Sequence, residues 1–175
     1  MIQRNTEPYL SSYFHGKGKQ LGLPIAGNFE LTARCNFNCP MCYVHMTPEQ
    51  VKGITNLGLA HIGDGVYELL ARTRVVERCP EGKVAQAHRK TVALVSAGAQ
   101  AKAARMLEEL LTPEETAVFH RGRNCHVNSV PKRASREEYA YATALETLLG
   151  HLYLSGQLDR IGELWNVVLQ ALGEV

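Results

Sequence analysis

The sequence contains no apolar run that approaches the roughly 20 residues needed to cross a membrane. Its beginning, MIQRNTEPYLSSYFHGKGKQ, also lacks the apolar core of a secretory signal peptide. Prolines number only seven, and there is no low-complexity tract or internal repeat. These absences argue against a membrane protein, a secreted protein and a disordered chain. We therefore expect a folded cytoplasmic protein with no membrane partner.

Neither sign of charge is in large excess, because 19 Lys and Arg residues face 17 Asp and Glu residues and give a net charge of +2. The net charge alone therefore indicates nothing about a polyanionic partner, and only the distribution of charge could. Hydrophobic residues make up 45% of the 175 residues. That fraction allows a core for one domain, or for one domain with an appendage.

The chain divides into two unequal parts. Residues 1 to about 27 show no clear period, and NFELTAR at 28–34 could form a short strand. From Asn56 onward, apolar residues recur at helical spacing in segment after segment. We therefore predict an all-α protein: a helical domain of about six helices over residues 54–175, preceded by a poorly structured leader over residues 1–53.

Helix boundaries are marked by capping residues. The helix starts that we predict are Thr47 with Pro48 and Gln50, Thr112 with Glu115, and Ser135 with Glu138; Ser96 marks a boundary between two helices and Gly122 a helix end. In the segment YAYATALETLLGHLYL the buried face is expected to consist of Ala142, Leu145, Leu148, Leu149 and Leu152.

Three of the five cysteines, Cys35, Cys39 and Cys42, are spaced CxxxCxxC. Three thiolates at this spacing can hold three corners of a four-iron cluster. The motif resembles that of radical SAM enzymes, which implies a barrel of alternating strands and helices around the cluster. The residues that follow are helical in pattern instead. We therefore interpret the motif as a remnant or a set of free thiols, with a bound 4Fe-4S cluster as the less favoured reading.

An acidic stripe lies along the predicted helix LAHIGDGVYELLAR, where His61, Asp64, Glu68 and Arg72 fall at i, i+3, i+7 and i+11. A solvated helix face would show the same pattern. However, Gly63 and Gly65 flank Asp64, and each glycine costs about 1 kcal/mol relative to alanine inside a helix. Their presence suggests the close approach of another helix or of a ligand.

Glu146 is the only charged residue between Tyr139 and Leu158. A carboxylate in such apolar surroundings needs a partner, because burying it alone is expensive. The partner could be an arginine. It could also be a divalent metal ion shared with Asp64, since hard cations such as Mg²⁺ are bound by one or two carboxylates plus water.

Four ordered blocks, LAHIGDGVYELLAR, VSAGAQAK, TPEETAVFHRGRN and YATALETLLGHLYL, resemble the mini-ribonuclease III family. This small branch of the ribonuclease III enzymes lacks a separate double-stranded RNA-binding domain. The resemblance spans about residues 55–172. It implies an all-helical homodimer that cleaves double-stranded RNA with Mg²⁺, typically in maturation of the large-subunit (23S) ribosomal RNA precursor.

The resemblance also implies roles for particular residues. Asp64 and Glu146 match the catalytic, metal-binding acids of the family. Full-length ribonuclease III enzymes carry two further acids, where this chain has Ala60 and Thr143. The number of metal ions is therefore left open, and Glu68 is a candidate for an additional metal-binding acid.

The segment FHRGRNCHVNSVPKRASR, residues 119–136, contains no acid. We expect it to include a long loop and to contact the phosphates of a duplex, which dominate nucleic-acid affinity. The candidate RNA-binding residues are Arg121, Arg123, His126, Lys132 and Arg133.

Two alternatives to a nuclease remain: an iron–sulfur or radical enzyme built on the cysteine motif, and a non-catalytic RNA-binding dimer whose acids only form ion pairs.

Overall fold

The computed structural model describes residues 46–125 and 134–174, all of which belong to one compact unit. Its elements are α2 (Pro48–Lys52), α3 (Asn56–Arg78), α4 (Val84–Val95), α5 (Ala97–Glu108), α6 (Pro113–Arg123), α7 (Arg136–Leu154) and α8 (Leu158–Leu172). The described ranges contain no strand, which confirms the predicted all-α class. Cys35, Cys39 and Cys42 lie outside the described residues, as does the rest of the predicted leader up to residue 45. None of the described helices is long and apolar enough to span a membrane.

The predicted helix starts are confirmed by local hydrogen bonds. At α6, the Thr112 backbone N–H donates to Glu115 Oε2 at 2.9 Å and the Thr112 side chain accepts from the Glu115 N–H. The same reciprocal pair forms at α7 between Ser135 and Glu138, and at α2 between Thr47 and Gln50. Ser96 ends α4 and caps α5.

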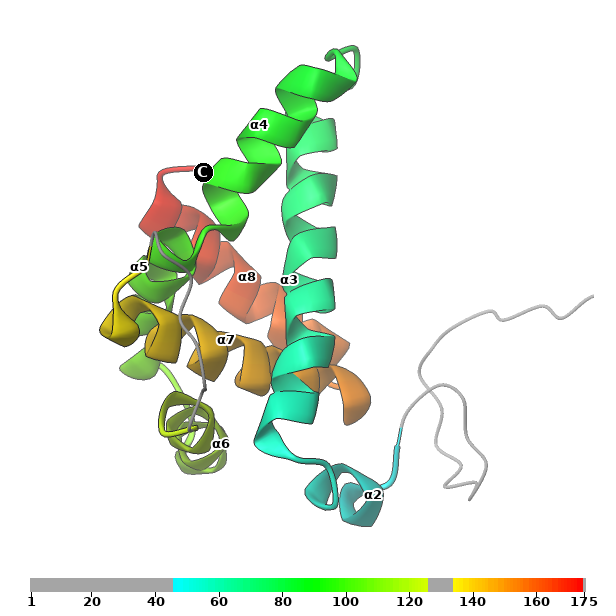
Figure 1. Cartoon of the computed structure of the whole chain (residues 1–175). Coiled ribbons are helices and arrows are strands. Elements are labelled where there is room, and N and C mark those ends of the chain that lie inside the picture. The colour runs from blue at the N-terminus through cyan, green and yellow to red at the C-terminus, as the bar shows by residue number, and fades with distance from the viewer. Residues whose placement is uncertain (1–45, 126–133, 175) are drawn as a thin grey trace, which may run out of the picture. The chain divides into compact units, whose positions relative to one another are not determined.

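Helix α7 lies at the centre of the described unit and contacts α3, α5, α6 and α8. It crosses α3 near the α2 end in Figure 1. Its predicted buried face is confirmed, because each of Ala142, Leu145, Leu148, Leu149 and Leu152 is at most 3% exposed. The opposite side is covered as well: Thr143 and Thr147 are buried. A helix enclosed on most sides fixes the position of any side chain that it carries.

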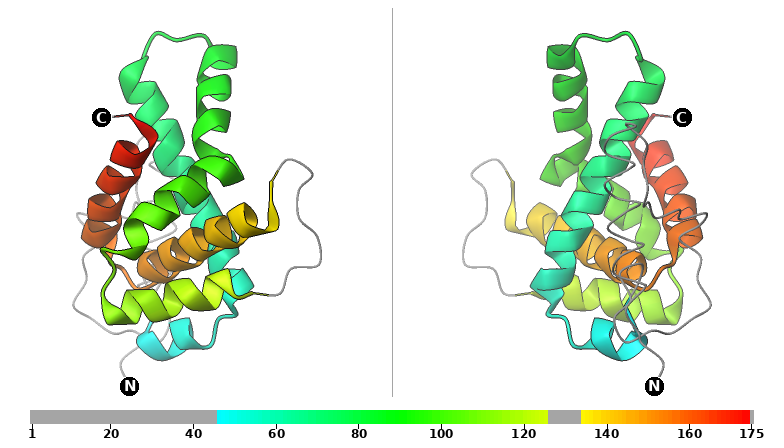
Figure 2. Two further views of the ribbon diagram at one scale, coloured as in Figure 1. Left: turned by 90° about the vertical axis from the view of Figure 1, so that its left-hand side faces the viewer. Right: turned by 90° about the vertical axis from the view of Figure 1, so that its right-hand side faces the viewer.

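Helices α3 and α4 form an antiparallel pair that extends beyond the other helices (Figure 2). The Tyr67 hydroxyl donates to the Leu94 carbonyl oxygen at 3.2 Å and ties the two helices together. The Tyr67 ring meets Trp165 of α8 edge to face, with ring centroids 5.3 Å apart. The outer part of the pair has a small core of its own around Ala71, Val75 and Leu94.

Two glycines bring the backbones of α3 and α7 into contact. A Cβ atom at Gly63 would overlap the carbonyl oxygen of Glu146, and one at Gly150 would overlap that of Leu59. The expected close approach is therefore confirmed at Gly63, whereas Gly65 has open space around its Cβ position.

Gly122 does not end α6, which continues to Arg123. A Cβ atom at Gly122 would lie 2.5 Å from Thr147 Oγ1, so this glycine allows α6 to pack closely against α7. The observed helix end thus lies one residue after the predicted one, and Gly122 serves a contact between helices.

The short helix α2 belongs to the segment that we assigned to the leader, yet it packs on the helical unit. Val51 is 2% exposed, and the Met46 backbone N–H donates to the Leu154 carbonyl oxygen at 2.9 Å. The boundary between residues 53 and 54 stays a prediction.

Candidate active site

Asp64 of α3 and Glu146 of α7, far apart in the sequence, line one open cavity of about 360 Å³. The cavity is lined by Leu57, Ala60, His61, Asp64, Tyr139, Thr143 and Glu146. Gly63 directly precedes Asp64 and touches the Glu146 backbone, so the glycine contact between the two helices also sets the positions of both acids. Asp64 is exposed, whereas Glu146 is partly buried.

The surroundings of Glu146 disfavour its negative charge. Burial, followed by the nearby charge of Asp64, raises the pKa of Glu146 to about 8, and a hydrogen bond with the Gln100 side chain opposes this rise. Burial, with a contribution from Glu146, also raises the pKa of the Tyr67 hydroxyl above its usual value. Within the described ranges no Arg or Lys forms an ion pair with Glu146 or Asp64. The alternative of an arginine partner for Glu146 therefore finds no support among these residues.

Two neighbouring carboxylates beside an open cavity suit a divalent cation. Such a cation supplies the positive charge that Glu146 lacks, and Mg²⁺ commonly takes one or two carboxylates and completes its coordination with water. The described part of the chain holds no group of three His, Cys, Asp or Glu residues that could bind a metal. Asp64 and Glu146 would thus be the ligands that the described residues provide, and water or substrate would fill the other coordination positions of the cation.

The two positions at which longer ribonuclease III enzymes carry further acids lie in the wall of the same cavity. Ala60 is 6% exposed and Thr143 is 4% exposed. The Thr143 backbone oxygen accepts a hydrogen bond from Thr147 Oγ1 at 2.7 Å. Among the residues that line this cavity, the acids are therefore Asp64 and Glu146.

The predicted acidic stripe is divided in the structure. His61 lines the cavity with Asp64, but Glu68 does not. Glu68 Oε1 instead accepts hydrogen bonds from the Arg72 guanidinium, the shorter at 2.5 Å. A metal-binding role for Glu68 stays a prediction that would require this ion pair to open.

The predicted RNA-binding residues are described only in part, because His126, Lys132 and Arg133 lie outside the described residues. Arg121 is exposed and forms no ion pair with another described residue. Arg123 is already engaged: its Nη1 donates to Glu108 Oε1 at 2.8 Å, and its guanidinium lies over the Tyr141 ring. Of these two arginines, Arg121 has the guanidinium available to a phosphate.

Gln100 is the site neighbour that the sequence reading missed. It is 2% exposed and interacts with Glu146 through its side-chain amide. The available signal was its position: Gln100, Ala103, Ala104 and Leu107 follow the i, i+3, i+4, i+7 pattern of a buried helix face. An amide in that pattern indicates a polar partner inside the fold.

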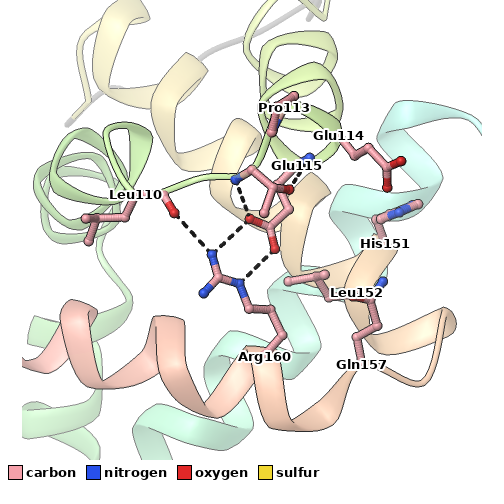
Figure 3. A pocket seen from close by; sticks show the side chains of 9 residues that line it. Leu110, Pro113, Glu114, Glu115, His151, Leu152, Gln157 and Arg160 are labelled. Atoms are coloured by element: carbon pink, nitrogen blue, oxygen red, sulfur yellow. Dashed lines mark hydrogen bonds and ion pairs between the residues drawn. The ribbon is translucent and has the colours of Figure 1, made fainter.

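A larger cavity of about 890 Å³ lies elsewhere, between α6, α7 and α8 (Figure 3). Two of the charged groups that line it, Arg160 and Glu115, pair with each other. Arg160 Nε donates to Glu115 Oε1 at 2.8 Å, Arg160 Nη2 donates to Glu115 Oε2 at 3.0 Å, and Nη2 also reaches the Leu110 carbonyl oxygen. This arrangement ties α6 to α8, and we interpret it as structural.

The helical architecture and the paired acids agree with the comparison of the sequence with known families. Residues 57–157 match the family model described as "Ribonuclease III domain". The protein is therefore an endoribonuclease of the ribonuclease III type. This assignment counts against the alternative of a non-catalytic RNA-binding dimer. The iron–sulfur hypothesis rests on cysteines that lie outside the described residues.

The similar curated proteins narrow this class. The chain is 38% identical over 128 residues to a protein of Clostridium tetani named Mini-ribonuclease 3, a match that covers 73% of this chain and 85% of the relative. It is 39% identical over 129 residues to the protein of the same name from a Thermoanaerobacter species, covering 74% and 90% of the two chains. A crystal structure of a Fusobacterium nucleatum protein superposes with a TM-score of 0.65 at 25% identity, covering 72% of this chain and 98% of that one. The chain belongs to the mini-ribonuclease III family.

Proposed function

We propose that this endoribonuclease cleaves double-stranded RNA in a reaction that depends on Mg²⁺ held by Asp64 and Glu146. The observation that carries the proposal is the meeting of these two acids, from different helices, in one open cavity where no described Arg or Lys pairs with them. The pKa of Glu146 is raised first by burial and then by Asp64. This rise supports the proposal, because a cation bound between Asp64 and Glu146 would offset the negative charge of both.

The two acids would have different roles in binding the cation. Asp64 is exposed and can reach a ligand directly, whereas Glu146 is held by its buried helix. When bound, Mg²⁺ orients and acidifies an attacking water and offsets charge on the phosphate. The Gly63 contact keeps the acids at a fixed separation, which limits the reorganisation needed when substrate arrives. We expect products with 5′-phosphate and 3′-hydroxyl ends.

Duplex binding is assigned to the segment between α6 and α7. Arg121 stands exposed near its start, and the sequence places Lys132 and Arg133 further along. Basic groups in one segment suit phosphates along an A-form helix, whose shape rather than sequence is read by most duplex-binding proteins. His126 would add charge only when protonated.

A homodimer would let each subunit cut one strand of the duplex. An exposed apolar stripe on α3 supports this assembly: Ile62, Leu69 and Val76 are spaced by seven residues and are 37%, 66% and 57% exposed. A second copy would cover this stripe. Leu69→Glu should shift the species in sedimentation velocity to the monomer, whereas Glu77→Gln, at an exposed position on the same helix, should not.

The substrate that we propose is the precursor of the large-subunit ribosomal RNA in the cytoplasm. The test is cleavage of a structured precursor RNA with Mg²⁺ and with EDTA. We expect cleavage only with Mg²⁺, and its loss in both Asp64→Asn and Glu146→Gln while duplex binding persists. Undiminished cleavage by Asp64→Asn would contradict the site. Duplex binding without cleavage by the parent protein would favour the non-catalytic alternative.

A further inference from the structure

Gln100 occupies a position where the fold alone would favour an apolar side chain. It lies in the first turns of α5, 2% exposed, and the next residues on its face, Ala103 and Ala104, are fully buried. A buried amide loses its hydrogen bonds to water, so each of its ends needs a partner inside the protein.

Only one end of the Gln100 amide has a described partner. Its Oε1 is buried and accepts no hydrogen bond from the described residues. The side chain is nevertheless a hydrogen-bond partner of the Glu146 carboxyl group, whose pKa it lowers. A leucine of similar volume would avoid the unsatisfied oxygen, so stability does not explain an amide at this place.

Among the described groups around Glu146, Gln100 is the hydrogen-bond partner of its side chain. From α3, Glu146 is faced by Asp64, which repels it, and by Tyr67, whose hydroxyl is already donated to the Leu94 carbonyl oxygen. His61 and Tyr139 line the cavity beside it. An amide N–H is directional and neutral. It can therefore fix the rotation of a carboxylate without competing with a cation for its charge.

From this geometry we infer that Gln100 is a positioning residue: its amide N–H holds the Glu146 carboxylate turned toward Asp64, so that both acids face the cavity and can share one divalent cation. The inference rests on the proposed function. It adds α5 to the site, because α3 and α7 provide the acids and α5 provides the group that orients one of them.

The experiment compares the parent chain with Gln100→Leu and with Gln170→Leu, a matched change at an exposed glutamine of α8. Mn²⁺ alone is titrated into each protein by calorimetry, and kcat and KM are measured on a duplex RNA. Gln100→Leu should weaken Mn²⁺ binding by about tenfold or more and lower kcat with little change in KM. Its melting temperature should be unchanged or higher, because the unsatisfied oxygen is gone. Gln170→Leu should resemble the parent in both titration and cleavage.

The outcomes separate the two hypotheses. If the parent binds Mn²⁺ but Gln100→Leu binds it equally well and cleaves at the same rate, the positioning role is wrong and the proposed site stands. If the parent binds no Mn²⁺ at the acids, the proposed function itself fails, and the role of Gln100 fails with it. Should Gln100→Leu fold poorly, Gln100→Met retains the unbranched shape without the amide and gives the same readouts.

Discussion

The backbones of α3 and α7 touch at Gly63 and Gly150, and this contact holds Asp64 beside Glu146. The Gly150 nitrogen lies 2.8 Å from where a Cβ atom on Gly63 would stand, too close for any real side chain. The separation of the two backbones that carry the acids is therefore set by main chain against main chain.

The first prediction concerns this contact. Gly63→Ala should force α3 and α7 apart, because its Cβ atom would overlap the Glu146 carbonyl oxygen. We expect a loss of about 2 kcal/mol or more in the free energy of unfolding, within the usual range for overpacking, and a large loss of duplex cleavage. Gly65→Ala is the matched control on the other side of Asp64. Its Cβ meets nothing within 4 Å, so it should stabilise the helix by up to about 1 kcal/mol and retain activity. Equal behaviour of the two variants in urea unfolding and cleavage would contradict the role of the contact.

The second prediction concerns pH. Because burial and Asp64 raise the pKa of Glu146 to about 8, the metal-free folded protein holds a proton there that the unfolded chain releases near pH 4.5. The folded state thus binds more protons between these values, and its stability should fall as pH rises through this window. Glu146→Gln should make the fall shallower, by an amount of the order of a few kcal/mol or less. Urea unfolding in EDTA at several pH values measures this, and parallel profiles for parent and variant would count against it.

The third prediction tests the ion pair in the larger cavity. Glu115 is 7% exposed, and its hydrogen bond with Arg160 is the main cause that holds its pKa below the usual value. Arg160→Met would leave the buried carboxylate unpaired and should cost about 2–3 kcal/mol near neutral pH. This stabilisation is present above the ordinary carboxyl pKa and is lost as pH falls through the lowered one, so the difference between parent and variant should shrink in acid.

Glu163→Gln is the control for that experiment, because Glu163 is the exposed partner of the same arginine, with 65% of its side chain accessible. It should change stability by less than about 1 kcal/mol. Both variants should keep duplex cleavage under conditions in which they are folded, since Glu115 and Arg160 line a different cavity from the two acids. Loss of cleavage in folded Arg160→Met would show that this cavity is functional rather than structural.

The fourth prediction concerns the basic segment. Lys132→Ala with Arg133→Ala should weaken duplex binding and lower the slope of log affinity against log salt by up to about two, since each phosphate contact contributes slightly less than one. The measurement is filter binding on an Asp64→Asn background, which prevents cleavage. Lys83→Ala with Arg89→Ala, at exposed positions of the α4 region, provides a control of equal charge. An unchanged slope in the segment variant would reject the assignment.

Most of the helical framework could be predicted because its signals are local. The reciprocal bonds of Thr112 with Glu115 and of Ser135 with Glu138 depend only on residues three positions apart, so the sequence contains them completely. The same holds for Ser96, which both ends and starts a helix. The acid pair came from two further signals, a lone carboxylate in an apolar helix and the family resemblance.

The parts that could not be predicted depend on contacts between helices. Gly122 has the local signature of a helix end, and only the position of Thr147 shows that it serves close packing instead. Glu68 and Arg72 share the predicted stripe, but the sequence does not show that they pair with each other rather than face the cavity. The role of Gln100 could not be predicted because nothing near it in sequence reveals Glu146 as its partner.

The ion pairs around Tyr141 bear on how this enzyme could be redesigned. The charge of Arg123 is balanced by Glu108, and Arg105 of α5 is likewise paired with Glu137. Both guanidinium groups lie against the Tyr141 ring. Apart from the exposed Arg121, the helical frame at the start of the basic segment is therefore close to electrically balanced. The attraction for a polyanion therefore comes mainly from the basic segment itself. Replacing that segment should change which RNA duplexes are bound, while the cavity with Asp64 and Glu146 keeps its geometry.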